Sequence, residues 1–73
     1  MDMDRYFLEI ALEEAEIAFS EGTVPIGAVL VDHEGNILSK GRNRIFTAND
    51  PTCHAEIDVI RKAGSKLLDP TYK

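Results

Sequence analysis

The sequence predicts an α/β fold in which a helix, a β-hairpin and a second helix follow one another along 73 residues. Apolar residues at three- and four-residue spacing predict a helix from about Asp4 to Glu21. A short apolar run, a turn cluster and a more polar run predict a hairpin between Ile26 and Arg42. Helix-start residues before an amphipathic segment predict the second helix.

The first helix carries a wide apolar stripe made of Leu8, Ala11, Leu12, Ala15, Ala18 and Phe19, widened by Phe7, Ile10 and Ile17. Most of the acidic side chains are expected on the other side, namely Glu9, Glu13, Glu14 and Glu16. Asp2 or Asp4 can cap the start, and Gly22 suits the position just past the end. A stripe this wide is suited to lying across a sheet.

The hairpin has two unequal strands. The run from Ile26 to Val31 favours a strand buried on both faces, and Gly27 within it indicates a close backbone approach. Asp32-His33-Glu34-Gly35-Asn36 is a turn, in which we expect His33 to be exposed and idle. The stretch from Ile37 to Arg42 is more polar and suits an edge strand. Because two strands make a weak sheet, a further strand is expected beyond the first.

The second helix is predicted to open at Asp50-Pro51-Thr52, since Asp and Thr are N-cap residues and Pro suits the first helical position. This places His54 and Glu56 in the first turn. Residues two apart diverge by about 200° in mid-helix, but at the open end both side chains can reach toward one point.

The remainder of this helix is expected to turn Ile57, Ile60 and Ala63 inward and to end near Gly64. Leu67 and Leu68 then need cover, and Asp69-Pro70-Thr71-Tyr72-Lys73 stops the chain.

Composition narrows the class of protein. The net charge of −5 lacks the basic footprint of nucleic-acid binders and favours a small-molecule substrate. A single cysteine excludes an internal disulfide, and 44% hydrophobic residues is typical of a globular chain. The acidic N-terminus is not a secretory signal, and no run approaches the roughly 18 apolar residues of a membrane span. We therefore predict a cytoplasmic protein.

Three segments in this order resemble the zinc-dependent nucleobase and nucleoside deaminases of the cytidine and deoxycytidylate type: Val24 to Val31 (VPIGAVLV), Gly41 to Arg44 (GRNR) and Asp50 to Ile57 (DPTCHAEI). The family includes guanine and cytosine deaminases and adenosine deaminases that edit tRNA. The resemblance implies a three-layer, cytidine-deaminase-like fold, of which residues 1–73 would be the N-terminal part of a single domain, with an incomplete sheet.

The resemblance also implies roles for individual residues. His54 would be a zinc ligand through its neutral imidazole, and Glu56 would carry a proton from the zinc-bound water to the ring nitrogen and the departing ammonia. Asn43 matches the asparagine that hydrogen-bonds the base, although a turn-forming asparagine after a strand is the alternative. Cys53 is expected to be a small buried hydrophobe, because its side chain diverges by about 100° from that of His54. The alternative is a thiol activated by the helix N-terminus.

One part of the family signature is missing. No Pro-Cys-x-x-Cys follows Glu56, so zinc would have one protein ligand where catalytic sites normally use three. We therefore expect Zn²⁺ to be weakly bound or absent in this fragment, and the chain to be inactive by itself. The intact enzyme would release ammonia from guanine, cytosine or adenosine.

The expected partners follow from charge and from the missing half. A free nucleobase or nucleoside is favoured over tRNA by the acidic charge, and a homo-oligomer or a complementing C-terminal half is expected. One alternative is a non-enzymatic module that docks on a partner through its open sheet edge. Another is a helical hairpin protein in which the motif is accidental.

Overall fold

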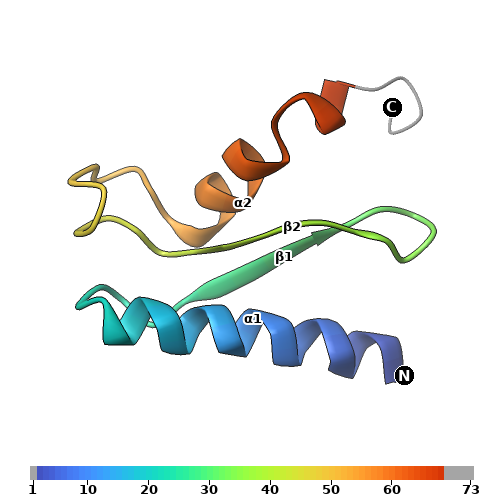
Figure 1. Ribbon diagram of the computed structural model, residues 1–73, viewed down its shortest axis with the longest axis horizontal. Helices are drawn as coiled ribbons and strands as arrows, with labels where there is room; N and C mark the ends of the chain where they lie inside the picture. Colours follow the sequence, from blue (N-terminus) through green and yellow to red (C-terminus); the bar gives the residue numbers. More distant parts are fainter. Residues whose placement is uncertain (1, 69–73) are drawn as a thin grey trace.

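The computed structural model describes residues 2–68, which form helix α1 (Asp2–Ser20), strands β1 (Gly27–Val31) and β2 (Ile37–Arg42), helix α2 (Ala55–Ala63) and the 3₁₀ helix η1 (Gly64–Leu68). The strands pair in antiparallel fashion, and α1 and α2 lie on opposite sides of the sheet (Figure 1). The predicted α/β order is confirmed, as is the three-layer arrangement. The molecule extends over 35 × 28 × 11 Å along its principal axes. The three layers lie next to one another in the view down the shortest axis, and this shortest dimension is about the diameter of one helix (Figure 1).

Helix α1 ends where the sequence predicts. Gly22 adopts a left-handed φ of 83° and donates its N–H to the Phe19 carbonyl at 3.1 Å. The Thr23 N–H donates to the Ala18 carbonyl, also at 3.1 Å. These two bonds form a Schellman motif, which satisfies the last carbonyls of the helix and turns the chain toward β1.

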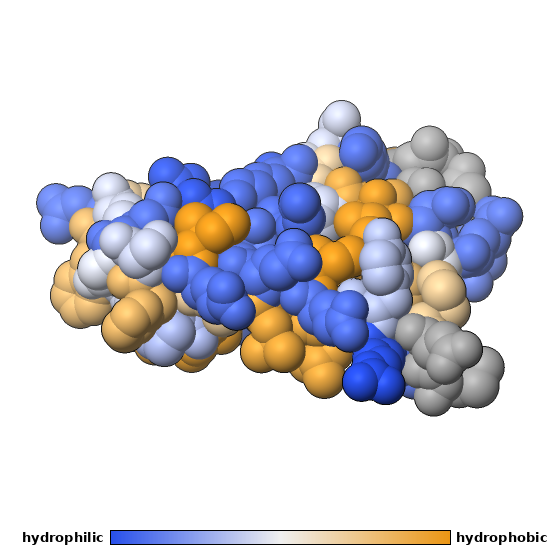
Figure 2. All heavy atoms as spheres, turned by 60° about the horizontal axis from the view of Figure 1, so that its bottom comes forward, coloured by the Kyte–Doolittle hydropathy of each residue, from blue (hydrophilic) through white to orange (hydrophobic). Residues whose placement is uncertain are grey.

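Only part of the predicted stripe on α1 meets the sheet. Ala18 is fully buried, but Leu8, Leu12 and Phe19 remain 60%, 54% and 71% exposed. Figure 2 shows apolar groups between the charged groups on the face that α1 helps to form. The stripe is wider than a two-stranded sheet can cover, so the expectation that all of it packs on the sheet is wrong for these three residues.

The opposite error concerns Glu14, which was expected on the solvent side. Its side chain is 8% exposed because the carboxylate faces β2, where Arg42 Nη1 donates to Glu14 Oε1 at 3.3 Å. The partly buried Arg42 guanidinium compensates for the loss of water around the carboxylate.

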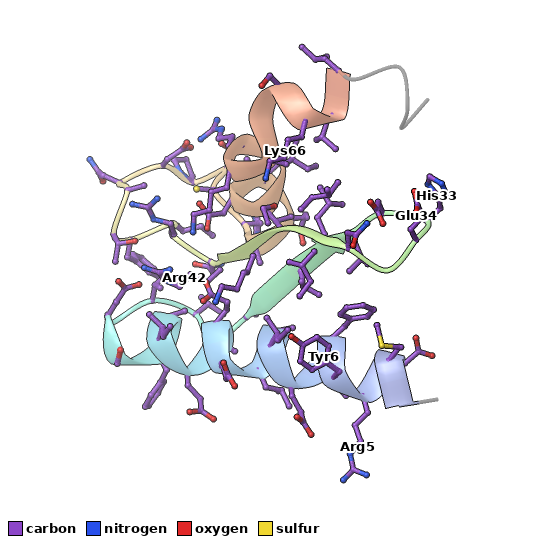
Figure 3. All side chains as sticks on the ribbon, turned by 45° about the vertical axis from the view of Figure 1, so that its right-hand side comes forward. Arg5, Tyr6, His33, Glu34, Arg42 and Lys66 are labelled. Carbon is purple, nitrogen blue, oxygen red and sulfur yellow. The ribbon has the colours of Figure 1, made fainter. Side chains whose placement is uncertain are left out.

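The hairpin confirms the predicted turn. The Asp32 carboxylate accepts the N–H groups of Glu34 and Asn36 at 2.9 Å each, and Gly35 takes a left-handed φ of 86°. The strand register shifts between Leu30 and Val31, which pair with Ser39 and Ile37, so the extra residue is Leu38 on β2, just after the turn. His33 is exposed, as expected, and lies with Glu34 at the hairpin tip, far from Arg42 (Figure 3).

Two glycines let the helices approach the sheet. A Cβ atom on Gly27 would collide with the backbone carbonyl oxygen of Ala11 and lie 2.8 Å from the Ala15 nitrogen. This confirms the close approach predicted at Gly27. A Cβ atom on Gly41 would lie 2.6 Å from the Val59 nitrogen, so Gly41 does the same for α2.

The core of the described chain is made of small residues: Ala18, Cys53, Ala55, Val59 and Ala63. Each residue of β1 is only partly buried, although a helix lies on each face. Within residues 2–68 the sheet has the order β1-β2, which leaves the far edge of β1 without a neighbouring strand. The sheet is therefore incomplete, as predicted.

The packed face of α2 also differs from the prediction. Ala55, Asp58, Val59 and Ala63 are buried, whereas Ile60 is 48% exposed. The helix ends at Ala63, next to Gly64, as expected, and continues as η1, where Lys66 Nζ donates to the Leu38 carbonyl at 3.2 Å (Figure 3).

Leu68, which was expected to need cover, is 72% exposed. The predicted stop from Asp69 to Lys73 lies outside the described residues. No helix within residues 2–68 is both long and apolar enough to cross a membrane.

Candidate functional site

Helix α2 begins later than the sequence predicts. The Asp50 carboxylate accepts the backbone N–H of Thr52 at 2.9 Å and its hydroxyl at 2.7 Å, and both bonds lower the pKa of Asp50. The Cys53 N–H donates to the Asp50 carbonyl at 3.0 Å. Asp50-Pro51-Thr52 is therefore a turn and not a helix start, because the carboxylate is satisfied by bonds within the turn.

The delay moves the N-cap to His54. Its backbone is extended, with φ −68° and ψ 166°, and its carbonyl accepts the Asp58 N–H at 3.0 Å. The His54 side chain makes no capping hydrogen bond and is exposed. Glu56 is the second residue of the helix and is also exposed. Both residues therefore lie at the open end of α2, although the helix starts four residues later than predicted.

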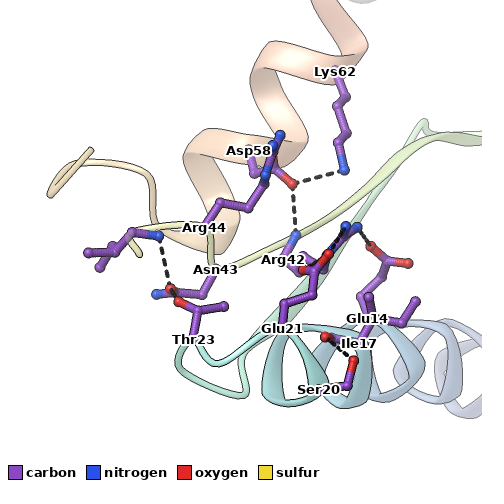
Figure 4. Close-up of polar contacts among 11 residues, drawn as sticks. Glu14, Ile17, Ser20, Glu21, Thr23, Arg42, Asn43, Arg44, Asp58 and Lys62 are labelled. Carbon is purple, nitrogen blue, oxygen red and sulfur yellow. Dashed lines mark hydrogen bonds and ion pairs between the residues drawn. The ribbon is translucent and has the colours of Figure 1, made fainter. Parts of the chain in front are cut away.

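Asn43, directly after β2, is the largest fully buried side chain of the described chain, at 1% exposure. Its Oδ1 accepts the Thr23 hydroxyl at 2.6 Å and the Ile45 N–H at 3.2 Å (Figure 4). The bond to Ile45 is the local turn that the sequence left open as an alternative, whereas the bond from Thr23 spans 20 residues and the burial is nearly complete. A residue that only forms a turn would need neither the bond from Thr23 nor this degree of burial.

Two hydrogen bonds donated by backbone N–H groups hold the Asn43 loop against α2 and the residues just before it. The Arg42 N–H donates to Asp58 Oδ2 at 2.9 Å, and the Arg44 N–H donates to the Cys53 carbonyl at 2.9 Å. Asn43 precedes Arg44 and His54 follows Cys53, so both residues are next to the hydrogen-bonded pair of Arg44 and Cys53. Cys53 is 3% exposed, which confirms that it is a small buried side chain.

Asp58 is the main electrostatic feature of the site. Its carboxylate is 4% exposed and pairs with Lys62 Nζ at 3.0 Å and with Arg44 Nη1 at 3.6 Å (Figure 4). Burial by itself would raise the pKa of Asp58, but the Arg42 N–H, Lys62 and Arg44 together lower it. Sequence reasoning missed this residue, although the four-residue spacing of Asp58 and Lys62 was a usable signal.

The end of β2 is also tied to α1. Arg42 donates from Nε to Glu21 Oε1 at 2.7 Å and from Nη2 to Glu21 Oε2 at 2.9 Å, in a bidentate pair (Figure 4). This contact lowers the pKa of Glu21 and raises that of Arg42. The backbone around Asn43 is therefore fixed from both helices.

We expect replacement of Asp58 by Asn to destabilise the chain at pH 7 by about 1–3 kcal/mol, because the charged hydrogen bonds are lost. The folded-state pKa of Asp58 lies below its unfolded value, which is about 3.9. The contribution of the carboxylate is therefore complete above that unfolded value and disappears as the pH falls through the folded-state pKa. Urea unfolding followed by circular dichroism at pH 7 and pH 3 measures the difference between the two chains.

The matched control is Glu13→Gln, which removes a charge from an exposed position of α1. Its stability difference from the wild type is expected to stay within about 0.5 kcal/mol at both pH values. A difference between Asp58→Asn and the wild type that is as large at pH 3 as at pH 7 would contradict the electrostatic role of Asp58.

The family resemblance implies zinc, but the described residues do not fit a complete zinc site. No group of three His, Cys, Asp or Glu side chains within residues 2–68 is arranged to hold a metal ion. His54 is an accessible candidate ligand, whereas Cys53 is buried beside it. A catalytic zinc centre normally takes three protein ligands, so the described chain offers one of them.

Comparison with known proteins matches residues 1–72 to the family model described as the cytidine and deoxycytidylate deaminase zinc-binding region. The tRNA-specific adenosine deaminase of Aquifex aeolicus is 48% identical over 62 residues, which are 85% of this chain and 40% of that protein. The chain thus spans well under half the length of this curated relative.

Two solved structures share the fold. One comes from a study of A-to-I editing by tRNA:A34 deaminases at the wobble position of transfer RNA. It has a TM-score of 0.81 and 45% identity over 92% of this chain and 51% of its own. The other is guanine deaminase from Bacillus subtilis, with a TM-score of 0.74 and 43% identity over 88% of this chain and 40% of its own.

Proposed function

Because the chain belongs to the cytidine and deoxycytidylate deaminase family, we propose that it supplies part of a zinc-dependent site that removes the exocyclic amine of a nucleobase and releases ammonia. The supporting observation is that His54 is the N-cap residue and Glu56 the second residue of α2, both exposed, with the Asn43 loop hydrogen-bonded against the same segment. The zinc-binding description of the matched family region supports the same reading.

Three residues would have separate roles in metal binding, proton transfer and base binding. His54 offers an imidazole nitrogen to the metal, and Glu56 is an exposed carboxylate placed to give and take a proton beside the reacting amine. Asn43 binds the base through its amide. The other two metal ligands would come from outside residues 2–68, either from a further segment or from a second polypeptide.

Adenosine in tRNA is the substrate that the comparisons favour, since the relative in Aquifex aeolicus is a tRNA-specific adenosine deaminase. The net charge of −5 argued against RNA, but much of the negative charge is on α1. The side of the molecule near α2 carries Arg44, Arg61 and Lys62, whose side chains are 40%, 61% and 37% exposed. Basic groups at such positions can contact phosphates.

A free base is the second candidate substrate, because 43% identity to a guanine deaminase structure is close to the identity with the tRNA deaminases. A small substrate would not need the basic side of α2. A docking module without activity remains the other alternative, supported by the exposed apolar side chains of α1 and the open edge of β1.

A split-enzyme assay tests the proposal. The chain alone is expected to bind zinc weakly and to release no ammonia from adenosine, guanine, cytosine or an adenosine-containing RNA stem-loop. Joined to the C-terminal remainder of the Aquifex aeolicus relative, the chain is expected to bind one zinc ion and to deaminate one of these substrates. Zinc is measured by competition with a chromophoric chelator, and ammonia by a coupled assay.

The outcomes of this assay separate the candidate functions. Turnover of the stem-loop alone identifies the RNA substrate, whereas turnover of guanine or cytosine identifies the free base. A folded chimera that neither holds zinc nor releases ammonia would support the docking module. Stoichiometric zinc and turnover in the 73-residue chain by itself would contradict the proposed need for outside ligands.

A further inference from the structure

We propose that Thr23 fixes the orientation of the Asn43 amide, so that Asn43 can present only a hydrogen-bond donor to a bound base. This inference rests on the proposed function for the identity of the ligand, but the orientation itself is a property of the ligand-free chain. Thr23 is a positioning residue in this scheme, because its hydroxyl acts through Asn43 and does not touch the base.

The oxygen of the Asn43 amide is identified by its partners. The Ile45 N–H can only donate, and it points to the Asn43 atom 3.2 Å away, so that atom must be the carbonyl oxygen. The Thr23 hydroxyl donates to the same oxygen at 2.6 Å. A carbonyl oxygen has two lone pairs, and both are therefore occupied by the protein.

The nitrogen of the amide is left for a ligand. Both hydrogen bonds of the Asn43 side chain among residues 2–68 are made through Oδ1, and none is made by Nδ2. No side-chain nitrogen or oxygen of the described residues is both fully buried and without a hydrogen-bond partner, so Nδ2 keeps contact with solvent and is accessible to a base that accepts from it.

Thr23 is itself held firmly. It is 6% exposed, and its N–H forms the Schellman bond to the Ala18 carbonyl at the end of α1. The backbone of Asn43 is fixed separately, because its own N–H donates to the Ile26 carbonyl at 2.9 Å. Asn43 is therefore held at two points, its backbone N–H and its side-chain oxygen. Figure 4 shows the bond from Thr23 to that oxygen.

The orientation restricts what the base can offer at this point. A ring nitrogen or a carbonyl oxygen can accept from Nδ2, whereas an exocyclic amine would meet a second donor and be repelled. Asn43 therefore binds the base by an edge other than its amine. The amine is left free to face Glu56, where the proposed reaction takes place.

Nuclear magnetic resonance of the 73-residue chain without ligand tests the orientation. In the wild type, we expect the Thr23 hydroxyl proton to be protected from exchange and to show a cross-relaxation contact with the Asn43 side chain. Thr23→Ser should keep the chemical shifts of the Asn43 side-chain amide protons, whereas Thr23→Val should move and broaden them while the backbone spectrum stays dispersed. An unprotected hydroxyl in the wild type, or unchanged amide protons in a folded Thr23→Val chain, would overturn the inference.

Asn43→Asp tests the donor claim in the chimera described above. The aspartate can still accept from Thr23 and Ile45, but its second oxygen is an acceptor where the ligand needs a donor. We expect KM to rise at least about tenfold, the effect of one lost hydrogen bond, with a smaller change in kcat. An unchanged KM would overturn the donor claim. If the wild-type chimera binds no base while the Thr23 results hold, the proposed function fails and the orientation stands.

Discussion

Replacing Glu56 by Gln in the chimera is expected to lower kcat by about 100-fold to 10,000-fold, the usual contribution of a positioned acid–base group. Glutamine has nearly the same shape and can still hydrogen-bond, but it cannot take up and return a proton. Because Glu56 is exposed at the second position of α2, the substitution leaves the packing unchanged. Initial rates of ammonia release at several substrate concentrations give kcat and KM separately.

Glu13→Gln is the matched control for this experiment, since it makes the same chemical change at an exposed position of α1. Its kcat is expected to equal that of the wild type within about twofold. A Glu56→Gln chimera that keeps more than about a tenth of the wild-type kcat would place the proton carrier elsewhere and remove the central residue of the proposed site.

Replacing Gly27 by Ala is expected to lower the free energy of unfolding by about 3 kcal/mol or more, at the upper end of the overpacking range. The new Cβ would collide with the Ala11 carbonyl oxygen and lie 2.9 Å from Glu14 Cβ, so α1 must move away from the sheet. A chain of this length has a total stability of roughly 4–11 kcal/mol. The variant should therefore unfold at a much lower urea concentration, measured by circular dichroism.

Gly22→Ala separates this collision from a backbone effect. Gly22 has a φ of 83° with no atom within 4 Å of the position of its Cβ. Alanine at this position is expected to lower the free energy of unfolding only through its left-handed backbone conformation, by about 1–2 kcal/mol. If the Gly27 variant loses no more stability than the Gly22 variant, the close approach of α1 to β1 does not constrain the fold.

The sequence was sufficient for the order of the elements and for the boundaries that depend on local chemistry. The hairpin turn formed where Asp32 and Gly35 predicted it, and α1 ended where Gly22 predicted. These features are decided by bonds among neighbouring residues. The close approach at Gly27 was also readable, because glycine in an apolar strand needs such a reason.

The errors have two causes, one local and one tertiary. Asp50 carries an N-cap side chain, but its carboxylate accepts the backbone N–H and the hydroxyl of Thr52 within a turn, so the helix begins only at Ala55. Glu14 was expected on the solvent side and Asp58 was not singled out, but Arg42 on β2 supplies a hydrogen-bond partner for each. Burial of a charged residue depends on a partner distant in sequence.

The candidate site shows the same division. The motif predicted His54 and Glu56 at the start of a helix, and the structure has them at the N-cap and at the second position of α2, both exposed. Asn43 was identified by resemblance, but its bond to Thr23 crosses 20 residues and needed the folded chain. The roles of all three residues stay predictions.

The exposed apolar side chains of α1 have a consequence for handling the protein. Exposed apolar side chains promote aggregation when no other protein surface covers them, and α1 exposes Leu8, Leu12 and Phe19. The same helix carries Glu9, Glu13 and Glu16 between them, and charged neighbours of this kind act as gatekeepers that oppose self-association. Solubility of the polypeptide at neutral pH thus depends on the mutual repulsion of these carboxylates, which added salt screens.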